Sequence, residues 1–196
     1  MDGSRKVKVG ILISGRGSNM SALIAASKAQ GYPAEIALVI ANVPEAGGLE
    51  AARAEGVEAI AIDSRPFGKD RQAHERAMDA ALRAAGVEVV CLAGFMRLLT
   101  PWFVDAWSGR MLNIHPSLLP DFKGLHTHAR AIAAGKEEAG CSVHLVTAEL
   151  DDGPILGQAR VPVLPGDDEA SLAARVLKEE HRLYPLCLAE FCRTLA

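Results

Sequence analysis

The stretch VKVGILISGRGSN, residues 7–19, is the part of the chain that sets the fold class. Its first eight residues are largely apolar and β-branched, which is typical of a buried strand. Gly15 and Gly17 follow in a short turn, and residues 18–30 then predict a helix with small residues on one face. A buried strand that passes through a glycine-rich turn into a helix is the opening unit of an open α/β sheet.

The same alternation continues along the first half of the chain. Further apolar runs predict strands at residues 35–43, 57–63 and 87–94. Helices are expected over residues 48–56 and 69–85, where glycine marks each C-terminal end. Strands and helices in this order predict a mostly parallel, twisted sheet with helices on both faces, which is a Rossmann-like α/β fold.

A short helix should separate the fourth strand from the fifth. Thr100 and Pro101 have the pattern of an N-cap residue followed by proline at the first helical position. The helix is expected to end near Trp107, before a strand over residues 110–115. Another helix is expected over residues 127–137.

The end of the chain should extend the sheet in the opposite direction. Residues 141–150 and 154–164 flank an Asp-Asp-Gly-Pro turn and predict an antiparallel pair of strands. A long final helix over residues 166–195 contains Pro185, which is expected to kink it. No linker separates these elements, so residues 1–196 are expected to form a single domain.

Composition limits the classes of partner. The formal net charge is −3, which gives no indication of nucleic-acid binding. No apolar stretch reaches the length of a membrane span, and no export-type segment follows the charged start. The four cysteines contain no Cys-x-x-Cys pair and lie in apolar runs, which indicates reduced, buried thiols. We therefore expect a cytoplasmic protein.

The first glycine-rich turn is a candidate anion site. A turn between a strand and a helix presents free backbone N–H groups, and Gly15 and Gly17 let the backbone approach an anion closely. Ser18 and Asn19 could cap the helix or contact the anion. A purely structural turn and a dinucleotide site are the alternatives. The third glycine of a dinucleotide motif is missing, and the second strand ends at Asn42 rather than at an acidic residue. The pattern favours a phosphomonoester.

A second candidate lies in LNIHPSLLP, residues 112–120. Asn113 and His115 are two positions apart on a strand and so share one face, while Pro116 ends the strand. Open parallel sheets bind ligands at the carboxyl ends of their strands. An amide and an imidazole there form a donor pair for a developing oxyanion. The alternative is a capped strand end with a histidine that is satisfied by packing.

Three further side chains are candidates with structural alternatives. Asp151 in the turn at residues 149–154 could orient an imidazole or accept a proton, although the turn sequence is common. His144 on the penultimate strand is either packed or a ligand contact. Glu180 falls within the apolar stripe of the final helix, where a carboxylate needs a partner such as a ribose diol or an arginine.

The loop AGFMRLL, residues 93–99, could form the wall of a site for a flat aromatic ligand. Alternatively, it could pack in the core, with Arg97 outside the core. Metal binding is a rival use of the histidines, which are His115, His126, His128 and His144 around Asp151. No His-Glu-x-x-His or Cys/His ligand pairing is present, and Asn113 is a poor ligand. No metal site is expected.

Taken together, these motifs resemble one enzyme family nearly from end to end. The chain is similar to the folate-dependent glycinamide ribonucleotide formyltransferases. The motifs in register are Ser14-Gly15-x-Gly17-Ser18-Asn19, Ala93-Gly94-Phe95-Met96-Arg97, Asn113-Ile114-His115-Pro116-Ser117-Leu118-Leu119-Pro120, Gly124-Leu125-His126-Thr127-His128, Ser142-Val143-His144, Leu150-Asp151-x-Gly153-Pro154 and Glu180-His181 before Tyr184-Pro185. Two positions depart from the family pattern: Asp152 stands where glycine is frequent, and Val43 where many members carry a basic residue.

The resemblance implies a role for each candidate. The residues implied to hold the substrate phosphate and ribose are Gly15, Gly17, Ser18, Asn19 and Glu180. The residues implied to contact the folate are Met96, Arg97, Leu98, Leu99, His144 and Asp151, with the loop around Asp151 closing over the pterin. The implied catalytic residues are Asn113, His115 and Asp151. The N-terminal half would then bind the phosphate, and the C-terminal half the folate.

The implied reaction moves a formyl group from the cosubstrate 10-formyltetrahydrofolate to the primary amine of glycinamide ribonucleotide, in de novo purine biosynthesis. Its products are formylglycinamide ribonucleotide and tetrahydrofolate, and it needs no metal or redox cofactor. Only these small molecules are implied as partners, without nucleic acid or membrane, for a monomer or weak homodimer. Methionyl-tRNA formyltransferase and formyltetrahydrofolate hydrolase are disfavoured because each is expected to carry a further domain. A non-catalytic phosphosugar-binding module would have no use for the Asn/His/Asp trio.

Overall fold

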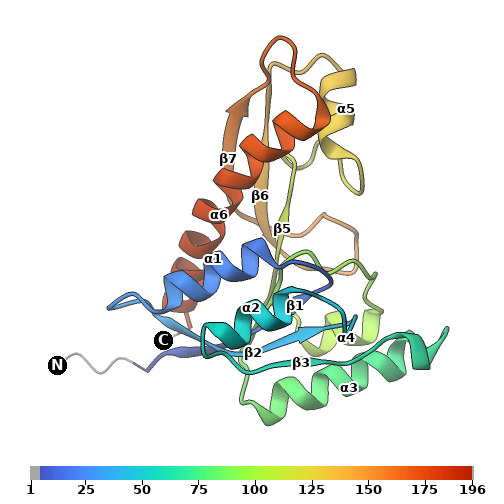
Figure 1. The fold of residues 1–196 in the computed structure, drawn as a ribbon, viewed down its shortest axis with the longest axis vertical. Helices are drawn as coiled ribbons and strands as arrows, with labels where there is room; N and C mark the ends of the chain where they lie inside the picture. The colour runs from blue at the N-terminus through green and yellow to red at the C-terminus, as the bar shows by residue number, and fades with distance from the viewer. Residues whose placement is uncertain (1–4, 196) are drawn as a thin grey trace.

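The computed structural model describes residues 5–195, which form a seven-stranded sheet in the order β3-β2-β1-β4-β5-β6-β7 (Figure 1). The strands are β1 (Val7–Ile13), β2 (Ala34–Ala41), β3 (Ala59–Ala61), β4 (Val89–Leu92), β5 (Met111–His115), β6 (Glu138–Leu145) and β7 (Ile155–Pro162). The first five strands are parallel, whereas β6 and β7 are antiparallel to their neighbours. The predicted fold class is confirmed.

Helices cover both faces of this sheet. They are α1 (Ser18–Ser27), α2 (Gly48–Ala54), α3 (Arg71–Ala84), α4 (Pro101–Ala106), α5 (Thr127–Ala133) and α6 (Glu169–Arg193), with a 3₁₀ turn at Arg65–Phe67. Alternation along β1 divides the core: Ile11 packs in the cluster that contains α1, α2 and α6, and Leu12 packs in the cluster that contains α3 and α4. All four cysteines are buried and free.

Several element boundaries differ from the sequence prediction, and the final helix continues through Pro185. The third strand is only Ala59–Ala61, shorter than the predicted 57–63. β6 begins at Glu138 and ends at Leu145, earlier than predicted at both ends, because its pairing with β5 and β7 sets its limits. α6 runs without a break past Pro185. Residues on either side of Pro185, including Tyr184 and Leu188, are fully buried in the core, and this packing outweighs the loss of one N–H group.

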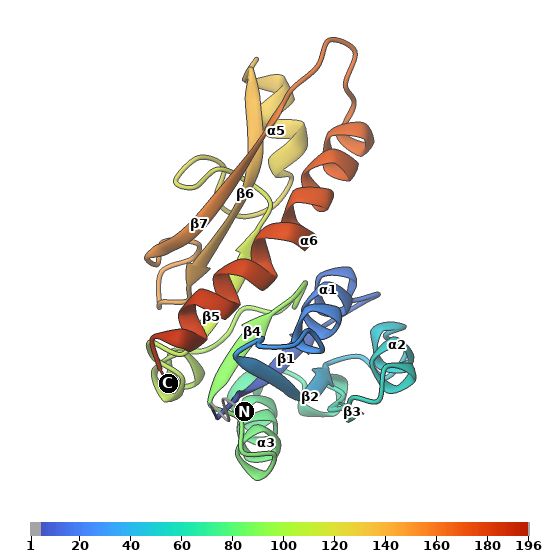
Figure 2. The ribbon, with the colours of Figure 1, turned by 90° about the vertical axis from the view of Figure 1, so that its left-hand side faces the viewer.

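The order of the strands reverses direction at β1. The chain moves outward from β1 to β2 and β3, then returns to β4 on the other side of β1. Loops after β1 and β4 therefore diverge at the carboxyl edge, where open α/β sheets bind ligands. Figure 2 shows α6 running diagonally from the far end of the β6–β7 pair toward α1 and the parallel strands. Within residues 5–195, no helix combines the length and apolar character needed to cross a membrane.

Candidate active site

The turn after β1 leads directly into α1 and leaves donors free. Gly17 is the N-cap residue of α1 in a left-handed conformation, with φ 69° and ψ 42°, and no side chain caps the helix there. The first N–H groups of a helix have no acceptor within the helix, and the helix dipole favours an anion at that end. Of the two alternatives for Ser18 and Asn19, capping of the helix is therefore not observed, and the first N–H groups have no side-chain acceptor.

Gly48, which sequence reasoning did not single out, and Ser14 of the first motif both support this turn. Gly48, at the start of α2, donates its N–H to the carbonyl oxygen of Gly15 at 3.1 Å. A Cβ atom at Gly48 would lie 2.5 Å from Ile13 Cδ1 and 3.0 Å from that carbonyl oxygen, so only glycine allows this approach. Ser14 Oγ donates to Asn42 Oδ1 at 2.5 Å and accepts from the Met96 N–H at 2.8 Å, which joins the ends of three strands.

Glu180 reaches the same turn from α6. Its Oε2 accepts a hydrogen bond of 2.7 Å from Asn19 Nδ2, and both side chains are buried. Burial raises the pKa of the Glu180 carboxyl, and the Asn19 amide opposes part of that rise. The protein partner of this carboxylate is therefore neither an arginine nor a solvent-facing group. Asn19 Oδ1 is buried without a partner, so the pair keeps unused hydrogen-bonding capacity beside the turn.

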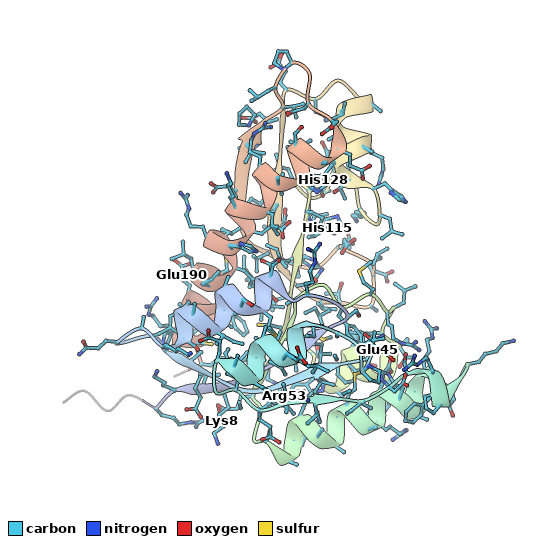
Figure 3. All side chains as sticks on the ribbon, in the orientation of Figure 1. Lys8, Glu45, Arg53, His115, His128 and Glu190 are labelled. Carbon is cyan, nitrogen blue, oxygen red and sulfur yellow. The ribbon has the colours of Figure 1, made fainter. Side chains whose placement is uncertain are left out.

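His115 lies at the end of β5 with oxygen atoms facing both ring nitrogens. Its Nδ1 is 3.4 Å from Asp151 Oδ2, and its Nε2 is 3.0 Å from the carbonyl oxygen of Phe122. Both ring nitrogens thus face oxygen atoms of the protein. Figure 3 shows His115 near the middle of the molecule, between the parallel strands and the β6–β7 pair.

Asn113 and His144 form the second half of this cluster. They are paired across β5 and β6, and Asn113 Nδ2 lies 3.2 Å from His144 Nε2. His144 Nδ1 is 2.9 Å from the carbonyl oxygen of Leu145, to which it must donate. Asn113 Nδ2 can then donate to His144 Nε2. This uses one of the two amide hydrogens of Asn113 and leaves the second for a ligand.

Asp151 completes the cluster from the turn before β7. Its Oδ2 accepts from the Gly124 N–H at 2.9 Å, and its Oδ1 lies 3.7 Å from His144 Nε2. Burial alone would raise the pKa of this carboxyl. The hydrogen bonds and the neighbouring imidazoles outweigh burial and hold the pKa below its usual range. The structure thus brings Asp151 to His115, as the sequence motifs predicted.

The two loops that meet at Asp151 carry unusual backbone geometry. Among residues 5–195, the non-glycine residues with positive φ are Phe122 at 55°, His126 at 57° and Asp151 at 50°. Such conformations cost energy and persist at functional sites where the surroundings hold them. The Gly124 N–H bond to Asp151 and the Lys123–Asp152 ion pair are two of the contacts between these loops.

The loop after β4 exposes apolar side chains at the same edge. Met96 is 71% exposed and Leu98 is 64% exposed, whereas Arg97 and Leu99 are only partly exposed. The alternative that this loop packs in the core thus holds for Phe95 and Leu99 but not for Met96 and Leu98. Exposed apolar residues beside a crevice form a surface suited to a flat aromatic ligand.

Strand register shows that the turn after β1 and the Asn113–His115 pair lie at one level of the sheet. Leu12 of β1 pairs with Leu92 of β4, and Leu92 pairs with Asn113 of β5. The glycine-rich turn after β1 and the Asn113–His115 pair are thus two strands apart, about 10 Å at the usual strand spacing. Within residues 5–195, no group of three or more His, Cys, Asp or Glu side chains is placed to hold a metal ion.

An amide donor next to an imidazole and a carboxylate, at the carboxyl edge of an open α/β sheet, defines a site for group transfer through an oxyanion. The chain belongs to the formyl transferase family, whose model matches residues 7–188.

Comparisons with individual proteins give more specific matches than the family model does. Phosphoribosylglycinamide formyltransferase from Escherichia coli is 46% identical over 181 residues, 92% of this chain and 85% of that protein. The crystal structure of phosphoribosylglycinamide formyltransferase from Brucella melitensis has a TM-score of 0.92 at 55% identity, covering 96% of both chains. The trifunctional purine biosynthetic protein adenosine-3 of Drosophila melanogaster is 46% identical over 187 residues, and this chain spans 14% of its length.

Proposed function

We propose that this protein transfers the formyl group of 10-formyltetrahydrofolate to the primary amine of glycinamide ribonucleotide. The products are formylglycinamide ribonucleotide and tetrahydrofolate, and the step belongs to de novo purine biosynthesis. The observation that carries the proposal is the meeting, at one edge of the sheet, of an uncapped helix N-terminus with the cluster of Asn113, His115 and Asp151. The names of the relatives support the same substrates.

The acceptor is proposed to bind through its phosphate and ribose. Backbone N–H groups of residues 15–19 hold the phosphate at the start of α1, where the helix dipole favours negative charge. Glu180 accepts from the ribose hydroxyls with the oxygen that Asn19 does not use. A carboxylate that is already fixed by Asn19 loses little conformational freedom when the acceptor binds.

Attack of the amine on the formyl carbon creates a tetrahedral oxyanion. The free amide hydrogen of Asn113 is the donor best placed to stabilise it, because both ring nitrogens of His115 already face Phe122 and Asp151. His115 lies beside this donor, and Asp151 Oδ2, 3.4 Å from its Nδ1, holds the ring in place. A proton must then pass from the attacking amine to the leaving nitrogen, either through His115 or through a water molecule.

The donor is proposed to lie against Met96, Arg97, Leu98 and Leu99, with His144 and the loop around Asp151 on the other side. Exposed apolar groups at Met96 and Leu98 suit the flat pterin. No metal or redox step is required, because formyl transfer between two nitrogens is an addition followed by an elimination. The folate therefore acts as a cosubstrate only.

The wider setting is part of the same proposal. One continuous sheet supports a single domain with the phosphate site in its N-terminal half and the folate site in its C-terminal half. A net charge of −3 supports small-molecule partners without nucleic acid or membrane. We propose a cytoplasmic monomer or weak homodimer.

The test is a product assay with the purified protein. Glycinamide ribonucleotide and 10-formyltetrahydrofolate should yield tetrahydrofolate and formylglycinamide ribonucleotide in equal amounts, and omission of the acceptor should abolish tetrahydrofolate release. Release of free formate without the acceptor would instead indicate a hydrolase. Absence of both reactions would contradict the proposal.

A further inference from the structure

We propose that Glu75 of α3 is a positioning residue for the folate donor, because its buried carboxylate fixes the backbone of the loop that carries Met96 and Leu98. The inference rests on the proposed function and adds a residue that does not belong to the motifs of the site. Glu75 is 2% exposed and lies in the layer of helices behind that loop.

Both carboxylate oxygens of Glu75 accept hydrogen bonds from Thr100 at the end of the loop. Oε1 accepts from the Thr100 N–H at 2.7 Å, and Oε2 accepts from the Thr100 hydroxyl. Thr100 is the N-cap residue of α4, yet its side chain makes no capping hydrogen bond. The Thr100 hydroxyl donates to Glu75 instead. The predicted N-cap position is therefore confirmed, but the Thr100 side chain does not cap the helix.

Two more contacts hold the same loop at regular intervals. One turn before Glu75 on α3, Arg71 Nη1 donates to the carbonyl oxygen of Leu98 at 3.3 Å. At the other end of the loop, the Met96 N–H donates to Ser14 Oγ at 2.8 Å. The backbone is thus anchored at residues 96, 98 and 100, while the side chains of Met96 and Leu98 stay exposed.

This arrangement presents two exposed apolar side chains on a rigid backbone. A ligand that packs on an ordered surface avoids the entropy cost of ordering it. A buried carboxylate is tolerated only when it is hydrogen-bonded, and removing it leaves the Thr100 N–H without its acceptor. Removal of the Glu75 carboxylate should therefore loosen the loop and weaken binding of the folate donor. The turn after β1 and the Asn113 cluster should be unaffected.

α3 itself does not depend on Glu75. Its N-terminus is capped by Asp70, whose side chain accepts from the Ala73 N–H at 2.9 Å, and Met78 and Leu82 are fully buried. Asp79, one turn after Glu75, pairs with Arg83 on the same helix and provides a matched control for the loss of a carboxylate.

The experiment compares Glu75→Ala, Glu75→Gln and the control Asp79→Ala in steady-state kinetics with both substrates varied. We expect Glu75→Ala to raise the donor KM roughly tenfold, which is the size expected when a buried hydrogen-bonded partner is lost. The acceptor KM and kcat should stay within twofold of wild type. Glu75→Gln keeps one acceptor oxygen and should recover most of the donor KM, and Asp79→Ala should leave both KM values unchanged.

Direct titration of each variant with tetrahydrofolate gives a second readout that does not need turnover. If Glu75→Ala does not fold, Thr100→Val replaces it, with an expected rise of about two- to threefold in the donor KM and in the tetrahydrofolate Kd. An unchanged donor KM, or equal rises in both KM values, in an enzyme whose wild type is active would overturn the inference while the proposed function stands. An inactive wild type would overturn the proposed function.

Discussion

Asn113 and His115 occupy alternate positions of β5, and their surroundings give them different tasks. Both side chains leave the same face of the strand, as the spacing predicted, while Leu112 and Ile114 pack in the cluster with α1 and α6. The structure changes one part of the expected chemistry. His115 does not present a free N–H beside the amide, because Phe122 and Asp151 face its two nitrogens. We therefore propose that Asn113 is the main donor to the oxyanion.

Replacing Asn113 tests this assignment. Asn113→Ala should lower kcat by roughly 10²–10³, the usual loss for one oxyanion donor, with little change in the acceptor KM. Asn113→Asp provides a control of the same shape that lacks the amide hydrogens, and it should be at least as slow. A rise in KM with an unchanged kcat in either variant would contradict the oxyanion role.

The lowered pKa of Asp151 predicts how the stability of the fold depends on pH. Because its pKa is lower in the folded protein than in the unfolded chain, its ionised form stabilises the fold at pH values above the unfolded pKa of about 4. That contribution disappears as pH falls through the folded pKa. Urea unfolding of wild type and Asp151→Asn between pH 7 and pH 3 should therefore show a difference in unfolding free energy that shrinks toward acid pH. A difference that grows toward acid pH would contradict the assignment.

At the scale of elements, the junction of β1 with α1 depends on glycine for two separate reasons. Gly17 needs a left-handed backbone at the N-cap of α1, whereas Gly48 of α2 needs space beneath the turn. Ser14 then ties this junction to the loop after β4. The proposed sites for the acceptor and the donor are consequently built on one shared framework of strand ends.

Gly17→Val tests the phosphate site at this junction. Valine at φ 69° is strained, and its Cβ would lie 3.1 Å from Met20 Cε. Gly31→Val is the control, since Gly31 has φ 77°, has no atom within 4 Å of an added Cβ and lies at the opposite end of α1. Both variants should lose about 1–2 kcal/mol of stability, but only Gly17→Val should raise the acceptor KM, by tenfold or more. Equal acceptor KM values would remove the turn from the site.

At the scale of the whole molecule, α6 joins the two ends of the sheet. It packs against α1, β6 and β7, carries Glu180 toward the turn after β1, and places Tyr184 beneath the site. Tyr184 Oη lies 3.0 Å from the carbonyl oxygen of Leu92 and 3.1 Å from that of Leu112, so its one hydrogen is shared between β4 and β5. The helix thereby fixes the two strand ends that lead into the catalytic loops.

Tyr184→Phe should therefore reduce stability more than it affects catalysis. Loss of a fully buried hydroxyl is expected to cost about 1–3 kcal/mol in unfolding free energy, which corresponds to a lower Tm by several degrees. Tyr32→Phe is the control, because that hydroxyl donates to the carbonyl oxygen of Pro185 on the same helix but is only partly buried. Tyr32→Phe should lose less unfolding free energy than Tyr184→Phe. Equal losses in thermal unfolding would show that burial of the Tyr184 bond is unimportant.

The sequence by itself determined the fold class, the order of the elements, the glycine-rich turn between β1 and α1, and the shared face of Asn113 and His115. These properties follow from local patterns, since the periods of strands and helices and the glycines of a turn are visible within a few residues. The family resemblance added the roles that no local pattern carries.

Only the tertiary structure decided which distant side chains meet. Asn19 bonds Glu180 across 161 residues, His115 faces both Phe122 and Asp151, and Glu75 holds Thr100 from another helix. Gly48 and Glu75 had no motif of their own, because their importance comes from a neighbour that the fold supplies. The physical reason is that packing and buried hydrogen bonds depend on distances in space, and distances in space are set when the whole sheet is assembled.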